Sequence, residues 1–144
     1  MTPDVNVLLA ASRSDHPHHA VALSWLEAAL MACESGATFT LMPMVLASVL
    51  RLATSPKIFL QPTPIAEAVG FIDAILARPG VNLGPIGPEW LKLRQLCLDK
   101  QLVGNDLPDA WLAAAVEQQG EHLVSFDRDF RKVLGRARLT LLQA

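Results

Sequence analysis

Strand-like apolar segments alternate with helix-like segments along this chain, and that alternation constrains the fold more than any other feature. Residues 38–41, 81–83, 122–125 and 139–142 carry the β-branched and large apolar side chains typical of buried strands. Residues 2–6 predict a further short strand that passes directly into a helix. Strands that alternate with helices form parallel sheets covered on both faces. We therefore expect a three-layer α/β/α fold with a central, mainly parallel sheet flanked by helices.

The chain length of 144 residues suits one domain, and we expect residues 1–144 to share one core. The composition is 51% hydrophobic and 18% charged, as in globular proteins. No apolar run reaches the length that spans a bilayer, and an aspartate at position 4 argues against a secretory signal. We therefore expect a cytoplasmic protein without a membrane segment, in which Cys33 and Cys97 are reduced thiols.

Helical periodicity predicts which side chains two of the helices turn towards the core. For the helix expected over residues 18–33, the inward positions are Val21, Trp25, Ala28 and Ala29. For the helix expected over residues 65–77, they are Ile65, Val69, Ile72 and Leu76. We interpret the three tryptophans as core anchors rather than base-stacking platforms, and the H-P-H-H run at residues 16–19 as a solvated turn rather than a metal site.

Three aspartates mark places where a strand ends or a helix begins. Asp4 follows the first strand, Asp127 follows the strand over 122–125, and Asp109 lies in the first turn of the helix expected over 107–119. Functional groups of open parallel sheets gather beyond the carboxyl ends of the strands, so these distant acids can meet. Two carboxylates about 5 Å apart repel by about 3 kcal/mol at an effective dielectric of about 20. Such a cluster is tolerated when a hard divalent cation fills it or when the acids share protons.

Three motifs, in this order and spacing, resemble those of PIN domains, and more narrowly those of the VapC toxins of bacterial toxin–antitoxin pairs. They are D-V-N-V-L-L at residues 4–9, G-N-D-L-P-D-A-W-L-A-A-A at residues 104–115 and L-V-S-F-D-R-D-F at residues 123–130. The resemblance covers nearly the whole chain. It implies a PIN-like fold, an endoribonuclease that depends on Mg²⁺ or Mn²⁺, a VapB-type antitoxin as protein partner, and a homodimer.

The resemblance also carries the family's site onto residues of this chain. It implies that the catalytic and metal-binding acids are Asp4, Asp109 and Asp127, with Asp129 as an occasional extra acid. Asn6 matches a polar position beside the first acid, and Ser125 matches the small hydroxyl residue before the last one.

One position departs from the family pattern. Many PIN domains have a glutamate three residues before the arginine that corresponds to Arg51, and here that position is Ser48. Asp106, one helical turn before Asp109, offers a compensating metal ligand, although it also suits a helix N-cap. The missing carboxylate argues against a second metal ion. It keeps open a second function, a catalytically weak PIN domain that acts as an RNA-binding or partner-binding module.

A basic strip follows Asp127, although the formal net charge of the chain is −2. Its members are Arg128, Arg131, Lys132, Arg136 and Arg138. The strip is either a solvated terminal face or a track for RNA phosphates that leads to the metal, with Arg128 or Arg131 holding a substrate phosphate. Arg51 is either an ion-pair partner of the acids or a surface charge.

Each acidic residue also has a purely structural interpretation. Asp4, Asp127 and Asp129 suit turns, and Asp109 suits the positive end of a helix dipole. A phosphoacceptor signalling domain is a third functional reading of clustered acids in a compact α/β fold. It is disfavoured because such domains need an acidic pair after the first strand, where Asp4 stands alone.

Overall fold

Five short strands form the centre of the computed structural model, which describes residues 1–143. Their bounds are β1 Thr2–Pro3, β2 Phe39–Leu41, β3 Val81–Leu83, β4 Leu123–Ser125 and β5 Leu139–Leu141. β1 pairs with β4 and β4 with β5, while β2 pairs with β3, and every pairing is parallel. Each strand lies where the sequence predicts one.

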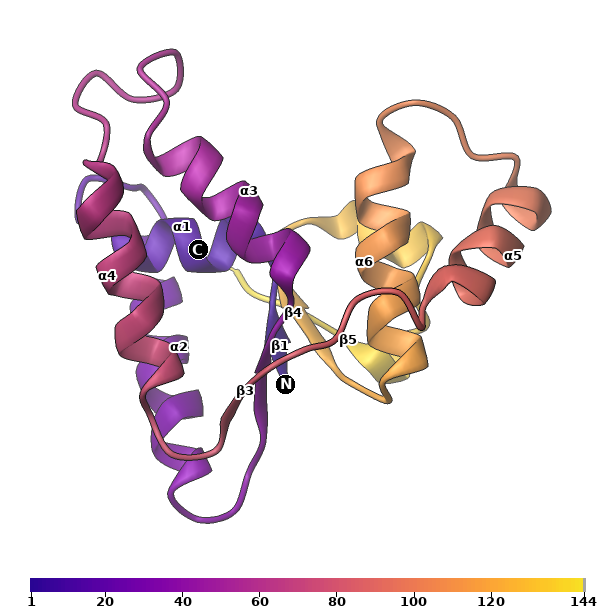
Figure 1. The fold of residues 1–144 in the computed structure, drawn as a ribbon, viewed down its shortest axis with the longest axis horizontal. Coiled ribbons are helices and arrows are strands. Elements are labelled where there is room, and N and C mark those ends of the chain that lie inside the picture. Colours follow the sequence, from indigo (N-terminus) through magenta and orange to yellow (C-terminus); the bar gives the residue numbers. More distant parts are fainter. Residues whose placement is uncertain (144) are drawn as a thin grey trace.

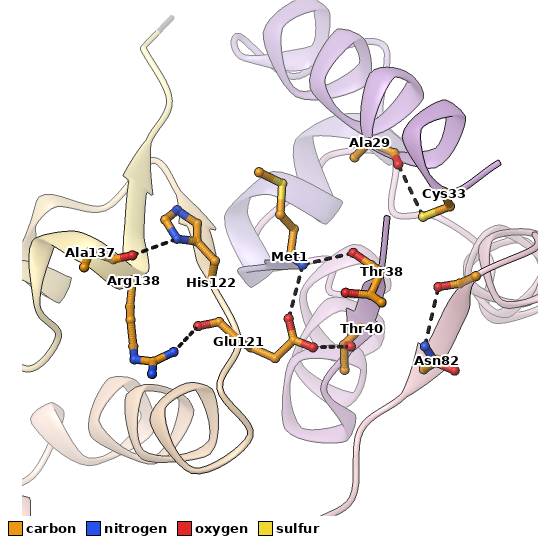
Figure 2. Close-up of polar contacts among 11 residues, drawn as sticks. Met1, Ala29, Cys33, Thr38, Thr40, Asn82, Glu121, His122, Ala137 and Arg138 are labelled. Atoms are coloured by element: carbon orange, nitrogen blue, oxygen red, sulfur yellow. Dashed lines mark hydrogen bonds and ion pairs between the residues drawn. The ribbon is translucent and has the colours of Figure 1, made fainter. Parts of the chain in front are cut away.

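The amino-terminal residue joins the two ladders into one layer (Figure 2). The Thr40 N–H donates to the Met1 carbonyl at 2.9 Å, and the Met1 ammonium donates to the Thr38 carbonyl at 3.0 Å. Glu121 lies just before β4 and contacts both sides of this seam: Oε2 is 3.2 Å from the Met1 ammonium, and Oε1 accepts from the Thr40 hydroxyl at 2.6 Å. The spatial order is therefore β3-β2-β1-β4-β5, with a topological switch point between β1 and β4.

Within residues 1–143, six α-helices cover the two faces of the sheet. Their bounds are α1 Val5–Ser12, α2 His19–Cys33, α3 Pro43–Ala53, α4 Ile65–Leu76, α5 Trp90–Lys100 and α6 Asp106–Gln118. In Figure 1, α1 to α4 lie on one side of the strands, and α6 lies on the other with α5 outside it. Two 3-10 turns, η1 Arg128–Lys132 and η2 Arg136–Arg138, connect β4 to β5. This arrangement confirms the predicted three-layer fold.

Small and apolar residues let α1 and α6 pack tightly into the core. α1 buries the run Val7–Ala11, and α6 buries Ala110 and the run Leu112–Val116. Phe39 of β2 and Leu123 of β4 are completely buried beside them. Because these two helices are held by their own packing, the acids at their amino-terminal ends have a rigid support.

The predicted inward faces of α2 and α4 were only partly right. α2 buries Ala22, Leu26, Leu30 and Cys33, while Trp25 and Ala29 pack partly against the core and Ala28 is exposed. α4 buries Ala68, Ile72 and Ile75, and leaves Ile65 and Val69 exposed. Both helices carry apolar residues around most of their circumference, so periodicity could not select the face that the sheet covers.

α5 is the most peripheral helix and has no buried residue. Its side chains Trp90, Leu91 and Leu98 are 60%, 74% and 53% exposed. Neither α5 nor any other helix of residues 1–143 combines the length and apolar character needed to cross a membrane.

Candidate active site

Asp4, Asp109 and Asp127 come together at the carboxyl ends of β1 and β4. Asp4 directly follows β1 as the N-cap of α1, and Asp127 lies two residues beyond the end of β4. Because β1 and β4 are parallel neighbours, their carboxyl ends lie side by side. Asp109 approaches from the first turn of α6 and lines the same pocket as Asp4. The three acids therefore meet at the switch point of the sheet, where open parallel sheets bind ligands.

Asp4 is buried, and both of its carboxylate oxygens accept hydrogen bonds. Oδ1 accepts from the Val5 N–H at 2.7 Å, and Oδ2 accepts from the Ser125 hydroxyl at 2.8 Å. Burial raises the pKa of Asp4 to about 6, the two hydrogen bonds lower it in part, and the charges of Asp109 and Asp127 raise it further. Asp4 takes part in none of the ion pairs formed by residues 1–143. Its negative charge is therefore uncompensated by the protein.

The Ser125 hydroxyl connects the acid after β1 to the turn after β4. It is fully buried, donates to Asp4, and accepts from the Asp127 N–H at 2.9 Å and from the Asn6 side-chain amide at 3.2 Å. The Asn6 Oδ1 accepts from the Phe126 N–H at 3.2 Å. Asn6 and Ser125 thus hold the two strand ends at a defined separation.

Asp109 is half-buried, and its pKa is raised by burial and then by the charges of Asp127, Asp129 and Asp106. Asp106 is exposed and is the first residue of α6, not its N-cap, which is Asn105. The Asp106 carboxylate accepts from the Val103 N–H at 3.1 Å.

The structural interpretations of Asp127 and Asp129 also have support in the structure. Asp127 caps η1 by accepting from the Asp129 N–H at 2.8 Å. The exposed Asp129 carboxylate lies 3.7 Å from the Lys132 ammonium. Capping and metal binding do not exclude each other, because a carboxylate has about four acceptor positions.

The donor set fits a hard divalent cation. Carboxylate oxygens are the ligands that Mg²⁺ and Mn²⁺ prefer, and Mg²⁺ commonly uses one or two carboxylates and keeps several waters. Burial is the main cause of the raised pKa values of Asp4 and Asp109, and the neighbouring acids raise both further, a repulsion that a cation would relieve. As the side chains stand, residues 1–143 contain no set of three acidic, histidine or cysteine groups gathered closely enough to hold an ion. The arrangement therefore suits two-carboxylate coordination completed by water.

Two hollows of different character meet at Asp109. One has a volume of about 510 Å³, contains Asp4 and Ser48, and is otherwise lined mainly by apolar side chains such as Leu93 and Trp111. The other has a volume of about 730 Å³, and its lining includes three acids together with Lys100 and Lys132. Ser48 therefore faces the acid pocket with a hydroxyl at the position where the family pattern has a carboxylate.

The predicted basic side chains are scattered rather than gathered at the acids. Arg51 is exposed in the last turn of α3 and forms no ion pair within residues 1–143, so it is a surface charge. Arg128 is exposed at the start of η1, and Arg131 lines a separate hollow with Arg136. Of the basic strip, only Lys132 lines the hollow that contains Asp109.

Sequence reasoning missed two side chains of this site and misjudged a third. Lys100 was not predicted because it lies at the end of α5, and a loop separates it from Asp109 on α6. Glu89 was missed because a glutamate at a helix start has no distinctive signal. Trp111 was interpreted as a core anchor, but it is 37% exposed and lines the acid pocket.

The H-P-H-H run begins in a turn, as predicted, but its histidines are only partly solvated. The His18 ring stacks on Phe126 with a centroid separation of 4.7 Å, and a ring nitrogen of His19 lies 2.8 Å from the Ala10 carbonyl. The run therefore packs against the segment that carries Asp127, and it forms no metal cluster among the described residues.

Comparison with known proteins identifies the class to which this fold and site belong. The family model for the PIN domain matches residues 1–135. The chain is 43% identical over 130 residues to "Ribonuclease VapC31" of Mycobacterium tuberculosis, covering 90% of this chain and 89% of that protein. It is 42% identical over 130 residues to "Ribonuclease VapC25" of the same species, with the same coverage. A structure of VapBC2 from Rickettsia felis, bound to a DNA fragment from its promoter, matches with a TM-score of 0.65 at 18% identity, covering 99% of this chain and 98% of that one.

The fold and the site define a class of protein: an α/β domain whose carboxylate pocket lies at the switch point of its parallel sheet. The chain belongs to the PIN domain family, and its relatives put it in the VapC group of that family. The resemblance predicted from the three sequence motifs is confirmed.

Proposed function

We propose that this protein is a metal-dependent endoribonuclease, the toxin of a type II toxin–antitoxin pair. The observation that carries the proposal is the pocket shared by Asp4 and Asp109, whose pKa values are raised by burial and then by neighbouring acids. Relatives named ribonuclease VapC support RNA as the substrate. Membership of the VapC group supports a VapB-type antitoxin as partner, and the Rickettsia felis neighbour is itself a VapBC assembly.

In this proposal, Asp4 and Asp109 hold Mg²⁺, or Mn²⁺ in its place, while Asp127 and Asp106 contribute directly or through water. The bound ion supplies an activated water and neutralises charge on the scissile phosphate. Ser125 and Asn6 orient the strand ends that carry two of these acids. Lys100 and Lys132 attract the RNA phosphates on either side of the reacting one.

One observation favours a second candidate function. Ser48 faces the acid pocket without a carboxylate, which leaves fewer metal ligands than the usual family pattern. A PIN domain with weak cleavage that binds RNA or a partner protein is consistent with that loss. The two candidates differ in whether RNA is cut at low enzyme concentration in Mg²⁺.

The test is cleavage of single-stranded RNA by the purified protein in millimolar Mg²⁺, with a chelator as the negative condition. We expect cleavage that the chelator abolishes, and a loss of about 100-fold or more in Asp4→Asn and in Asp109→Asn. Asp73→Asn is the matched control, because Asp73 is an exposed aspartate on α4, outside the pocket. Cleavage that persists in chelator, or at the wild-type rate in both site variants, rules out this mechanism. Binding without cleavage supports the second candidate.

A further inference from the structure

Trp111 is held in the wall of the acid pocket by an unusual partner. Its indole Nε1–H donates to Glu89 Oε1 at 2.7 Å. Glu89 is only 3% exposed, and its other oxygen, Oε2, accepts from the Gly87 N–H at 2.7 Å. Glu89 forms no ion pair within residues 1–143. A buried carboxylate held by two neutral donors is costly to maintain, and the geometry it imposes on the indole is correspondingly well defined.

The loop before α5 is shaped to make this contact. Gly87 has a φ of +110°, a conformation that side-chain-bearing residues rarely adopt. Two residues later, Glu89 ends the loop and turns inward, from where it reaches across to α6. The Trp111 ring is thus fixed from outside its own helix.

The fixed indole is nevertheless not a core residue. It is 37% exposed, and it lines the apolar hollow that also contains Asp4 and Asp109. A phenylalanine has no N–H donor, whereas the N–H of tryptophan lets Glu89 set the ring orientation. A rigid, partly exposed aromatic ring beside a reactive centre is preorganised to receive a flat ligand at little entropic cost.

The two hollows that share Asp109 differ in character and suit different parts of a nucleotide. The hollow with Lys100 and Lys132 is polar, and it would suit phosphates once a cation balances its three acids, whereas the hollow with Trp111 is largely apolar and suits a neutral base. The apolar hollow has a volume of about 510 Å³, within the range of about 300–1,000 Å³ found for small-molecule pockets. A base is the part of RNA with an apolar face that can lie against an indole.

We propose that Trp111, oriented by Glu89, stacks on an unpaired nucleobase next to the scissile phosphate. This inference rests on the proposed ribonuclease function and assigns a role within the same site. Trp111 contacts substrate, and Glu89 is a positioning residue that acts through the indole. Because every base has a π-face, stacking selects unpaired over paired nucleotides more strongly than it selects one base over another.

The experiment uses the Mg²⁺-loaded protein and two matched tryptophan variants. Trp111→Leu removes the platform, and Trp90→Leu removes a more exposed indole on α5 that does not line the acid pocket. Each protein is mixed rapidly with a short single-stranded oligo(U) or oligo(A). Tryptophan emission is followed before cleavage, and KM and kcat are then measured on the same RNA.

In the wild type and in Trp90→Leu, we expect RNA to quench the emission. In Trp111→Leu, the quenching is lost, RNA binding weakens about 5- to 150-fold, and KM rises with it. Trp111→Phe keeps a ring but loses the N–H donor, and should retain part of the affinity. Glu89→Gln should raise KM while the folded fraction stays high, because the indole remains but its orientation is relaxed.

The outcomes separate this inference from the proposed function. If the wild type cleaves RNA and Trp111→Leu has an unchanged KM and RNA affinity, the stacking proposal is wrong and the ribonuclease proposal is unaffected. The exposed indole then belongs to a protein-contact surface. If RNA quenches Trp111 but is never cut, stacking stands and the nuclease proposal fails. If RNA neither binds nor is cut by a folded wild type, both are wrong.

Discussion

The buried carboxylate of Asp4 links the stability of this protein to pH. Its pKa is about 6 in the folded state and near 3.8 in the unfolded chain. The folded protein therefore binds this proton more tightly than the unfolded chain does. Its stability is greatest when Asp4 is protonated, and it declines as the pH rises from about 4 to about 6.

We predict that Asp4→Asn removes this pH dependence in the presence of a chelator. The neutral amide avoids a burial penalty of about 3 kcal/mol, so the variant should be more stable than the wild type at pH 7 and little different at pH 4. Thermal unfolding at both pH values measures the effect. Asp73→Asn, on the surface of α4, should show the wild-type profile. An Asp4→Asn protein that is less stable than wild type at pH 7 would contradict the prediction.

We expect Mg²⁺ to raise the stability of the wild type relative to that of Asp4→Asn. If Mg²⁺ binds the folded wild-type pocket as proposed, millimolar Mg²⁺ should raise the melting temperature of the wild type and not that of Asp4→Asn. Binding should tighten as the pH rises through about 6, because the Asp4 proton must leave first. Calorimetric titration with Mg²⁺ at pH 5.5 and 7.5 tests this directly. Equal affinities at the two pH values would separate Asp4 from the metal site.

Ser125 tunes the same acid through its hydroxyl. Its loss in Ser125→Ala removes a donor to Asp4, so the pKa of Asp4 should rise and the acidic limb of the pH–rate profile should move to higher pH. We expect RNA cleavage near neutral pH to fall about 10- to 100-fold, as is typical when a residue that orients a metal ligand is lost. Ser12→Ala is the control, because that hydroxyl bonds only the Leu9 carbonyl in α1. An unshifted pH profile would argue against coupling.

At the scale of elements, Arg13 fixes the long connection between α3 and α4. Its guanidinium is buried at the end of α1 and lies 3.7 Å from the Phe59 ring centroid. It donates to the Thr63 hydroxyl at 3.0 Å, to the Gln61 carbonyl at 2.9 Å and to both carboxylate oxygens of Asp15. One planar side chain thus ties three segments of the chain together.

Lysine cannot reproduce this fork of donors, so Arg13→Lys should lower the free energy of unfolding by about 1–3 kcal/mol. Urea denaturation measures the loss. The matched variant Arg51→Lys changes an exposed arginine that forms no ion pair in the described structure, and it should shift stability by no more than about 0.5 kcal/mol. Similar losses in both variants would show that Arg13 is not a special anchor.

At the scale of the whole molecule, the exposed apolar residues of α5 form a candidate interface for the homodimer that the family resemblance predicts. Trp90, Leu91 and Leu98 are all more than half exposed on one helix without buried residues. A short helix with so little burial gains stability when a partner covers it.

We therefore predict a solution mass of twice the 15.6 kDa chain in light scattering. Leu91→Glu with Leu98→Glu should shift the protein towards the monomer, whereas Leu60→Glu, at a fully exposed residue of the α3–α4 connection, should not. A monomeric wild type at micromolar concentration would contradict the homodimer. If Leu60→Glu alone dissociates the dimer, the interface does not lie on α5.

The sequence determined the elements and their order, because β-branched runs and helical periodicity are local signals. The strands and the acids at their ends were predictable for that reason, whereas the hydrogen bond from Ser125 to Asp4 was not predicted. Helix faces were less predictable where apolar residues surround the helix, as in α2 and α4.

Only the tertiary structure decided what surrounds the acids. Burial and the parallel neighbours β1 and β4 bring Asp4 close to charges more than a hundred residues away, and this proximity shifts its pKa. The contact between Glu89 and Trp111 joins a loop to a helix 22 residues later, and no local pattern encodes it. Distances and burial between remote segments are properties of the packed chain, so they become visible only when the chain is folded.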